Sequence, residues 1–411
     1  MTHNRLESPL SITDTRSTFR STRPGTAAIR CGLILSVFSA LLLAAGPARA
    51  QSETVLYSFG SQSGDGSTPY AGLILDKQGT LYGTTYLGGA NNEGTVFKLT
   101  PSGTETVLYS FQSAGLIYPY AGLVLDKHGN LYGTEPYGGE NSQGMVLKFT
   151  TVGDATVLYA FGGQSGDGLQ PNAGLVFDKQ GYLYGTTVYG GANNMGTVFK
   201  LAPSGTETVL HTFGSQSGDG IYPFDGLVLD QHGNLYGTTY RGGANGYGAV
   251  FKVTPSGTET VLYSFGSQSG DGLYPFAGLV LDKQSDLYGT TLQGGANGYG
   301  AIFKVTPSGT ETVLYSFGSQ SGDGYGPHES LAFDKQGNLY GTTYLGGANG
   351  GGTVFKMTPS GTETVLYSFG SQSGDGLYPF GGLVFDKQGD LYGTTLIGGA
   401  YGWGTVFKLT P

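Results

Sequence analysis

Cysteine is almost absent from this sequence, since Cys31 is the only one among 411 residues. A single thiol cannot form an intramolecular disulfide, and it supplies no set of thiolates for redox chemistry. We therefore expect the fold to be stabilised by packing and by closure of its sheets.

Positive charge is also scarce, because 20 lysines and arginines face 29 aspartates and glutamates. Phosphate backbones and anionic membranes bind basic surfaces, so no nucleic-acid partner is expected. The sequence contains no phosphate-binding loop, dinucleotide fingerprint or nucleophile elbow. It therefore predicts no cofactor and gives no direct sign of an enzyme.

Histidines are few, and they fall on unrelated parts of the chain. A metal site needs several ligands of this kind brought to one place, and no spacing in the sequence indicates that. We accordingly expect no metal site. The five histidines are His3, His128, His211, His232 and His328.

Glycine is abundant, at 76 residues, whereas proline numbers only 17 and no G-X-Y period occurs. This composition excludes collagen. The 29 tyrosines and 22 phenylalanines also argue against a disordered glycine-rich chain, because their rings need burial. A globular protein rich in β-strands is expected, with glycines at turns and close contacts.

Residues 1–50 differ from the rest of the chain. Arginines, among them Arg16, Arg20, Arg23 and Arg30, precede an apolar run from Cys31 to Gly46, and Ala48 and Ala50 form an A-x-A cleavage site. This layout predicts a secretory signal peptide with a long basic region, cleaved near Ala50. The alternative, a membrane anchor, would need about 20 apolar residues. Secretion is expected, with no membrane span in residues 51–411 and an excess of 27 acidic over 14 basic side chains there.

One short string, LYGT, recurs seven times along the chain. The first two copies are 50 residues apart and all later ones 52. A fixed period of about fifty residues is typical of a repeat architecture. The copies begin at Leu81, Leu131, Leu183, Leu235, Leu287, Leu339 and Leu391.

Each repeat is consistent with four strands. In the fifth unit the expected strands are residues 278–282, 287–291, 301–305 and 312–317, separated by turns rich in Gly, Asn and Pro. Gly289, inside the second strand, is expected to let a neighbouring sheet approach closely. Four antiparallel strands in about fifty residues are typical of a β-propeller blade.

The chain ends decide between a closed ring and an open solenoid. The mature chain would begin with a fourth strand at 54–59 and end with a third strand at 405–409. The first segment would then complete the last blade, which removes both free sheet edges. We therefore predict an all-β fold, a seven-bladed β-propeller with four-stranded antiparallel blades. Residues 51–411 form its single domain, and the N-terminal strand closes the ring.

The consensus strings VLYSFGSQSGDG, GLVLDKQGNLYGTT and GGANNxGTVFKLTPSGT together resemble the GloVer tandem repeat of exported bacterial proteins. The resemblance covers residues 53–411. It implies export and a surface or extracellular role, often with a C-terminal anchor. Here the sequence ends at Pro411, directly after a blade strand, which favours release. The family supplies no established catalytic residues to transfer.

The loops after the second and fourth strands share one face of a propeller, the expected binding face. They are rich in Gly, Asn, Gln, Ser, Asp and Tyr, which suits sugars, because aromatic rings stack on pyranoses and polar groups bind hydroxyls. The alternative is that Gly and Asn form turns while the aromatic rings pack between blades. The candidate residues on this face are Tyr222, Tyr274, Tyr378 and Trp403.

Departures from the repeat are a second source of candidates. Asp225 and Glu329 replace small residues found in the other five copies, and His328 precedes Glu329. Arg241 is the only basic residue among the loops after the second strand. The two acids should lie at the mouth of the central channel, where paired carboxylates suit glycoside hydrolysis if about 5–9.5 Å apart. Drift within a redundant array explains these departures equally well.

Each GDG loop also carries an aspartate, which invites a calcium site. Calcium needs six to eight oxygen ligands, and each loop offers one carboxylate. We therefore expect this aspartate to cap its own turn, and the aspartate of LDKQG to do the same in its hairpin.

Together these observations favour an exported, non-enzymatic, monomeric propeller that binds a carbohydrate or another extracellular partner through its loop face. A polysaccharide-acting enzyme, either a glycoside hydrolase or a lyase, is the first alternative, with the acids at the channel mouth. A structural or adhesive envelope protein, in which repetition itself is the function, is the second.

Overall fold

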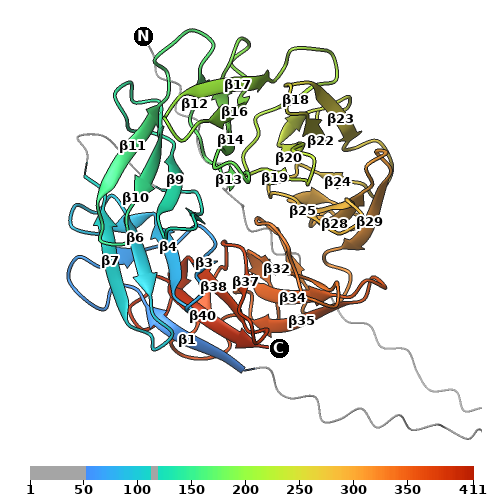
Figure 1. The fold of residues 1–411 in the computed structure, drawn as a ribbon. Coiled ribbons are helices and arrows are strands. Elements are labelled where there is room, and N and C mark those ends of the chain that lie inside the picture. Colours follow the sequence, from blue (N-terminus) through green and yellow to red (C-terminus); the bar gives the residue numbers. More distant parts are fainter. Residues whose placement is uncertain (1–51, 113–118) are drawn as a thin grey trace, which may run out of the picture. The chain divides into compact units, whose positions relative to one another are not determined.

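The computed structural model describes residues 52–112 and 119–411, and within these ranges every regular element is a β-strand. Seven four-stranded antiparallel sheets are arranged around a central axis (Figure 1). The predicted seven-bladed β-propeller is therefore confirmed. The signal peptide and its cleavage site near Ala50 lie outside the described residues. No helix in the described part of the chain is long and apolar enough to cross a membrane.

Each blade has a short inner strand near the axis and three longer strands outside it. Blade 1 comprises β3 (Ile74–Leu75), β4 (Leu81–Thr85), β6 (Thr95–Leu99) and β7 (Glu105–Ser110). Blade 2 comprises β8 (Val124–Leu125), β9 (Leu131–Glu135), β10 (Met145–Phe149) and β11 (Ala155–Ala160). Blade 3 comprises β13 (Val176–Phe177), β14 (Leu183–Thr187), β16 (Thr197–Leu201) and β17 (Glu207–Thr212).

The remaining blades follow the same order. Blade 4 comprises β19 (Val228–Leu229), β20 (Leu235–Thr239), β22 (Ala249–Val253) and β23 (Glu259–Ser264). Blade 5 comprises β25 (Val280–Leu281), β26 (Leu287–Thr291), β28 (Ala301–Val305) and β29 (Glu311–Ser316). Blade 6 comprises β31 (Ala332–Phe333), β32 (Leu339–Thr343), β34 (Thr353–Met357) and β35 (Glu363–Ser368). Blade 7 comprises β37 (Val384–Phe385), β38 (Leu391–Thr395), β40 (Thr405–Thr410) and β1 (Ser52–Ser58).

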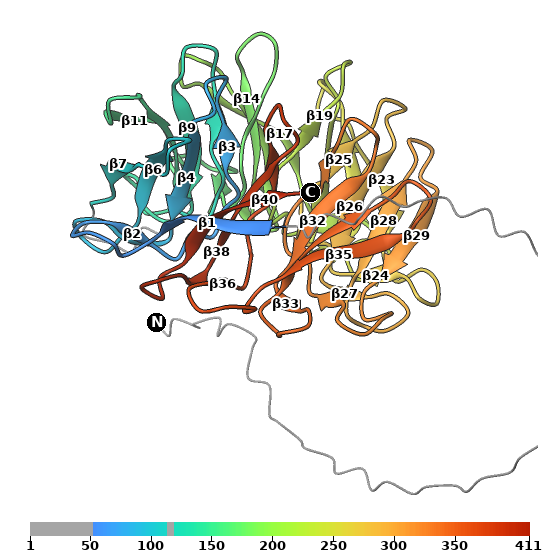
Figure 2. The same cartoon turned by 90° about the horizontal axis from the view of Figure 1, so that it is seen from below.

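Small two-stranded sheets are formed by the loops after the second and fourth strands, on one face of the ring (Figure 2). We call this face the loop face. The pairs are β2 (Gly66–Ser67) with β5 (Leu87–Gly88), β12 (Gly168–Leu169) with β15 (Tyr189–Gly190), β18 (Gly220–Ile221) with β21 (Arg241–Gly242), β24 (Gly272–Leu273) with β27 (Gln293–Gly294), β30 (Gly324–Tyr325) with β33 (Leu345–Gly346), and β36 (Gly376–Leu377) with β39 (Ile397–Gly398).

The ring is closed by its N-terminal strand, as the sequence predicts. Strand β1 pairs antiparallel with β40, from Ser52 opposite Thr410 to Ser58 opposite Thr405. A further closing bond runs from the Thr394 hydroxyl in blade 7 to the Ala71 carbonyl beside blade 1, at 3.2 Å. Pairing from both chain ends leaves blade 7 with the same four strands as the others.

The recurring LYGTT box is explained position by position. In the first copy Leu81 is buried in the core, and the Tyr82 hydroxyl donates to Asp76 at 3.3 Å. The hydroxyl of Thr84 donates to the Ala121 carbonyl of the next unit at 3.2 Å, which links adjacent blades. The second threonine, Thr85, shares a 2.8 Å hydrogen bond with Thr95 on the neighbouring strand. Each residue of the box therefore has its own role in the blade.

The glycine of this box corrects one prediction. A Cβ added to Gly289 would lie 2.7 Å from Phe303 and 2.9 Å from Leu279. Both side chains belong to the fifth unit itself, so no neighbouring sheet approaches here. The expectation of a close inter-sheet contact at Gly289 was wrong; the glycine makes room for a phenylalanine ring of its own blade.

The core lies between blades. Phe59 at the end of β1 is fully buried, and its ring meets that of Phe97 in blade 1 edge to face, with centroids 5.1 Å apart. Val406 from blade 7 and Leu73, Leu81 and Leu99 from blade 1 complete the buried part of this cluster. Equivalent clusters join the other blades, so removing one blade exposes the apolar face of its neighbour.

The recurring aspartates cap turns, as predicted. Asp65 of the first GDG loop accepts backbone N–H bonds from Gly60 at 2.8 Å and Ser61 at 3.0 Å. Asp76 of the LDKQG hairpin accepts from the backbone of Gln78 and Thr80, both at 2.8 Å. Backbone donors of this kind favour the ionised carboxylate and fix the loop conformation.

Candidate functional site

The central axis is surrounded by a collar of mostly aromatic side chains, one from each unit. Most neighbouring members are in ring contact; the shortest centroid distance, 4.6 Å, joins His328 to Phe380. Burial among these rings lowers the pKa of His328 to about 4, and its Nδ1 lies 2.7 Å from the Gly326 carbonyl. We call this set the aromatic collar: Tyr70, Tyr120, Asn172, Phe224, Phe276, His328 and Phe380.

The two unusual acids lie directly after collar residues in the sequence and approach one another. The Asp225 carboxylate accepts the backbone N–H groups of Gly226 and Gly278, whereas Glu329 accepts only that of Ser330, at 3.3 Å. Burial, and then the neighbouring Asp225, raise the pKa of Glu329 well above its usual range. Burial also raises the pKa of Asp225. The structure thus brings Asp225, His328 and Glu329 together near the axis.

The inner strands leave little space at this point. A Cβ added to Gly72 would lie 3.0 Å from the backbone nitrogen of Gly382, and one added to Gly226 would lie 3.1 Å from the Gly174 carbonyl oxygen. The acids therefore border a narrow axis beside the collar, and the Asp225 carboxylate already accepts two backbone N–H groups. This arrangement suits a packed centre better than a sugar subsite.

The three tyrosines proposed from the loops are half-buried and packed. Tyr222, Tyr274 and Tyr378 all have positive φ, between 57° and 60°. A non-glycine residue keeps this conformation only where its surroundings hold it. Here each backbone N–H donates to a carbonyl of the preceding unit, and each ring contacts another tyrosine. Their position agrees with the alternative that these rings pack between blades.

Arg241 extends from β21 on the loop face and is exposed. Its guanidinium carbon lies 5.7 Å from the centre of the Tyr240 ring, a cation–π distance. Within the described residues it forms no ion pair. It is therefore separate from the two acids at the axis.

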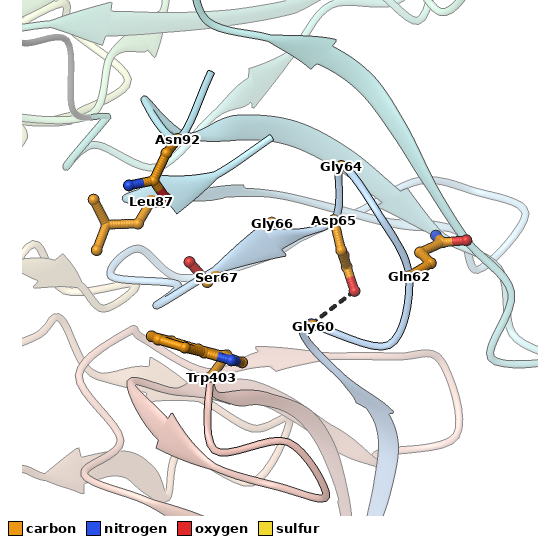
Figure 3. A pocket seen from close by; sticks show the side chains of 9 residues that line it. All are labelled: Gly60, Gln62, Gly64, Asp65, Gly66, Ser67, Leu87, Asn92 and Trp403. Carbon is orange, nitrogen blue, oxygen red and sulfur yellow. Dashed lines mark hydrogen bonds between the residues drawn. The ribbon is translucent and has the colours of Figure 1, made fainter. Parts of the chain in front are cut away.

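Trp403 borders a cavity of about 330 Å³ on the loop face, at the junction of blades 7 and 1 (Figure 3). Closure of the ring forms this cavity, because Trp403 comes from blade 7 and the other walls come from the loop between β1 and β3 and from the loop that follows β4. The lining residues are Gly60, Gln62, Gly64, Asp65, Gly66, Ser67, Leu87, Asn92 and Trp403.

The indole of Trp403 is held in place but remains accessible. Its backbone carbonyl accepts the N–H of Thr68 at 2.8 Å. A Cβ added to Gly60 would meet the ring at 2.5 Å, so glycine is needed beneath one edge of the indole. The side chain is nevertheless 53% exposed, and Figure 3 shows a ring face turned toward Ser67 and Leu87. This is the geometry of an aromatic platform.

Polar groups stand around this platform. The Asn92 side-chain oxygen accepts the Gly88 N–H at 3.1 Å, which orients its amide nitrogen as a donor. Gln62 donates to Glu105 at 3.1 Å and keeps its own carbonyl oxygen as an acceptor. Ser67 adds a hydroxyl. The cavity therefore combines an aromatic face with donors and acceptors.

Two other units carry an aromatic ring at the position of Trp403. Tyr247 is 38% exposed and Tyr299 is 51% exposed, and each leans over a glycine, Gly266 and Gly318 respectively. The loop face thus presents three similar platforms, of which Trp403 is the largest.

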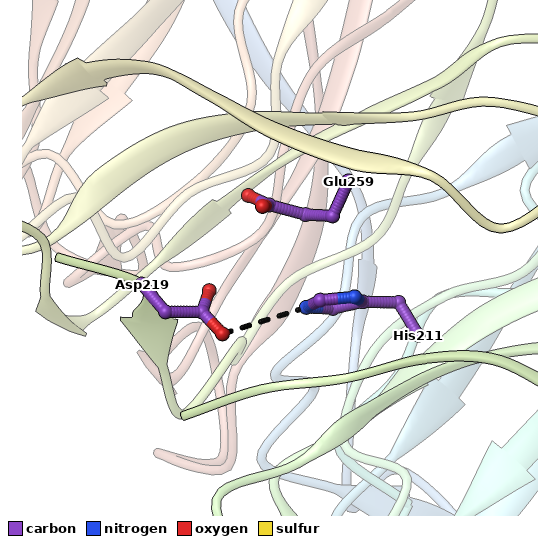
Figure 4. A group of neighbouring side chains, drawn as sticks. All are labelled: His211, Asp219 and Glu259. Carbon is purple, nitrogen blue, oxygen red and sulfur yellow. Dashed lines mark ion pairs between the residues drawn. The ribbon is translucent and has the colours of Figure 1, made fainter. Parts of the chain in front are cut away.

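A further cluster was missed by the sequence analysis. His211 on β17, Asp219 in the following loop and Glu259 on β23 place one potential ligand atom each within 4.8 Å of one another (Figure 4). The sequence does contain a sign of this cluster. His211 occupies the third position of the VLYSF string, where the other six copies have tyrosine. Recognising it required knowing that outer strands of adjacent blades meet.

A profile of the Gloeobacter/Verrucomicrobia repeat matches residues 45–176, 118–285, 163–332 and 269–411. The chain belongs to this repeat family. The resemblance drawn from the VLYSFGSQSGDG and LYGT strings is thereby confirmed. No protein with a curated description matches the sequence.

Solved structures similar to this member of the repeat family include two described as extracellular domains of hybrid two-component systems from B. thetaiotaomicron. Their TM-scores are 0.58 and 0.55, with sequence identities of 11% and 13%. They match 87% and 88% of this chain, which spans only 39% and 41% of their lengths. A gluconolactonase from Xanthomonas campestris has 14% identity and a TM-score of 0.44, over 87% of this chain and 89% of its own. Similarity at the level of the first two shows a common propeller fold.

Proposed function

We propose that this protein is an exported, non-enzymatic propeller that binds a neutral carbohydrate at the Trp403 cavity. The observation that carries the proposal is the half-exposed indole facing a polar cavity. Aromatic rings bind the apolar face of a pyranose through its C–H groups, while neighbouring amides and hydroxyls bind the sugar hydroxyls.

Size and charge both favour a neutral sugar unit. A cavity of about 330 Å³ is at the small end of the range for small-molecule sites, which suits one sugar ring of a longer chain. Asp65 lines the cavity, and the whole chain carries a net charge of −9. Anionic polysaccharides would be repelled by this surface.

Export rests on the pattern of residues 1–50, which has a basic segment, an apolar run and an A-x-A site. Two proteins of similar fold are described as extracellular domains, which is compatible with this location. Outside the cell, a polysaccharide of a cell wall or matrix is an accessible ligand.

A binding screen tests this proposal. Protein starting at Gln51 is applied to neutral glycans and polysaccharides, and release of reducing ends is monitored in the same samples. We expect binding without release, and a loss of at least tenfold in affinity for Trp403→Ala. Tyr401→Ala is the matched control, because Tyr401 is 54% exposed nearby but does not line the cavity.

Other outcomes would contradict the proposal in distinct ways. Release of reducing ends would favour the polysaccharide-acting alternative and direct mutagenesis to Asp225 and Glu329. Binding that is equal in the wild type and in Trp403→Ala would place the ligand elsewhere. Binding only to dense glycan surfaces, with weak effects of every single loop, would favour the adhesive envelope alternative.

A further inference from the structure

Among the described residues, six junctions between blades each carry one carboxylate pair, and the pairs share one design. An aspartate in the GDG loop faces a glutamate on the outer strand of the next blade, and at least one oxygen of each is buried without a hydrogen bond to any described residue. The pairs are Asp65–Glu105, Asp167–Glu207, Asp219–Glu259, Asp271–Glu311, Asp323–Glu363 and Asp375–Glu53.

Five of these pairs have a tyrosine beside them. In each of the five, the tyrosine hydroxyl donates a hydrogen bond to the aspartate, at 2.7–3.0 Å. The tyrosine hydroxyl already donates its hydrogen bond to the aspartate. It therefore stabilises the carboxylate pair but is no strong ligand for a metal ion. In these five sites the tyrosine therefore satisfies one aspartate oxygen, and it supplies no nitrogen ligand.

The junction of blades 3 and 4 is different because His211 stands in place of the tyrosine. Its Nε2 lies 3.6 Å from Asp219 Oδ2, too far for a hydrogen bond. The His211 side chain is 9% exposed and that of Asp219 is 1% exposed. Nε2 has no hydrogen-bond partner among the described residues, and neither do Asp219 Oδ1 and Glu259 Oε1.

His211, Asp219 and Glu259 thus come together from three different segments (Figure 4), and each carries a buried atom without a hydrogen bond to any described residue. Burial of such atoms is costly unless something binds them. Two carboxylates and a neutral imidazole would be balanced in charge by one divalent cation. One nitrogen and two oxygens suit zinc and its neighbours in the first transition series, whereas calcium takes six to eight oxygens.

We propose that His211, Asp219 and Glu259 form a binding site for a divalent transition-metal ion, represented by Zn²⁺, which bridges blades 3 and 4. The three ligand atoms lie within 4.8 Å of one another. In a tetrahedral zinc site with bonds near 2.0–2.1 Å, ligand atoms are roughly 3.3 Å apart, so the side chains need to close by up to about 1.5 Å. Ser215 and Gln216 hold the carboxylates from outside, by bonds of 3.0 Å to Asp219 and 3.1 Å to Glu259. Water completes the coordination.

The repeat itself supplies matched variants. His211→Tyr gives this junction the residue of five intact sites, so the variant should fold while losing the nitrogen ligand. Conversely, Tyr263→His places an imidazole beside Asp271 and Glu311 and should create a second site. His232→Gln, at an exposed hairpin, controls for adventitious binding to surface histidines.

The experiment measures zinc content. Tag-free protein is stripped with chelator, dialysed against low micromolar ZnSO₄ and analysed by mass spectrometry of the metal. We expect one zinc per chain for the wild type and for His232→Gln, none for His211→Tyr, and two for Tyr263→His. Zinc should also raise the melting temperature of the wild type by roughly 2–5 °C, and leave that of His211→Tyr unchanged.

Three results would overturn the proposal. The wild type could bind no zinc, or His211→Tyr could keep as much zinc as the wild type. Tyr263→His could also remain at one zinc per chain, which would show that the carboxylate pair does not supply the other ligands. The site is independent of the Trp403 cavity, so either proposal can fail alone.

Discussion

Asp65 and Glu105 place two carboxyl groups side by side at the junction of blades 7 and 1, and the structure repeats this pairing around the ring. Burial, and then the charge of Asp65, raise the pKa of Glu105 from 4.5 to about 7. The sequence of the second unit lacks both partners: Ala155 occupies the glutamate position, and the segment 111–119 that corresponds to the GDG loop contains no aspartate. The two acids are absent together, as expected for residues that act as a pair.

These pairs predict how stability depends on pH. The six glutamates all have a pKa raised to about 7, so between about pH 4.5 and 7 the folded protein holds protons that the unfolded chain has lost. Stability should therefore fall as pH rises through this window and level off above it. His328, with its pKa lowered to about 4, opposes this trend with a single proton.

Urea unfolding of metal-free protein at pH 5.0 and 7.5 measures this effect. The midpoint should be higher at pH 5.0, and the difference should shrink in Glu105→Gln and Glu311→Gln. Glu140→Gln, in an exposed loop, should leave the difference unchanged. A midpoint that is higher at pH 7.5 would mean that the buried pairs do not hold protons.

The bond that closes the ring predicts a second effect. Thr394→Val removes the hydroxyl that donates to Ala71, and a buried carbonyl is left without that donor. The cost should be about 1–2 kcal/mol of unfolding free energy, measured by urea denaturation.

The equivalent hydroxyl in the fifth unit is the control for this prediction. Thr290 Oγ1 is buried and has no hydrogen-bond partner among the described residues. Thr290→Val should therefore be neutral, or stabilising by up to about 1 kcal/mol. Equal destabilisation by both substitutions would show that the loss reflects packing and not the inter-blade hydrogen bond.

The glycine of the LYGTT box gives a third prediction. Gly289→Ala would place a methyl group 2.7 Å from the Phe303 ring, so overpacking should cost about 1–3 kcal/mol. In the second unit Leu147 replaces that phenylalanine, and a Cβ on Gly133 would meet only a Leu123 methyl group, at 3.0 Å. Gly133→Ala should therefore cost less than about 1 kcal/mol. Similar losses in both variants would indicate a backbone effect instead of a clash with the ring.

Much of the fold could be predicted from the sequence because the same pattern of strands and turns recurs seven times. The LYGT spacing predicts the blades, and the strands at the two ends of the array predict how the ring closes. The inner strands are shorter than expected: in the fifth unit the pairing covers only Val280–Leu281. Before this pair the Gly278 N–H donates to Asp225 of another unit, and after it Asp282 begins the hairpin turn, which its side chain caps.

The sites were less predictable, because the units have nearly identical sequences. The sequence therefore does not show which side chains of different units come together in the fold. Trp403 was recognisable from the sequence because the other units carry different residues at this loop position. The structure places its ring beside a cavity. The set of His211, Asp219 and Glu259 was not recognisable, since the two acids are ordinary members of their repeats and only the contact between outer strands unites them. The composition of the loops suggested that Tyr222 and its equivalents could bind a ligand. In the structure, backbone hydrogen bonds and contacts with neighbouring rings fix their positions.

Trp403 is the only tryptophan in the chain, so intrinsic tryptophan emission reports on the proposed sugar site alone. The most direct test of the account titrates the best neutral oligosaccharide from the screen while following this emission and, in parallel, the heat of binding. We expect the emission to shift and saturate at the same concentration as the heat, because a stacked sugar displaces water from the indole. Saturable heat with unchanged emission would mean that the sugar binds away from Trp403, and would contradict the central claim.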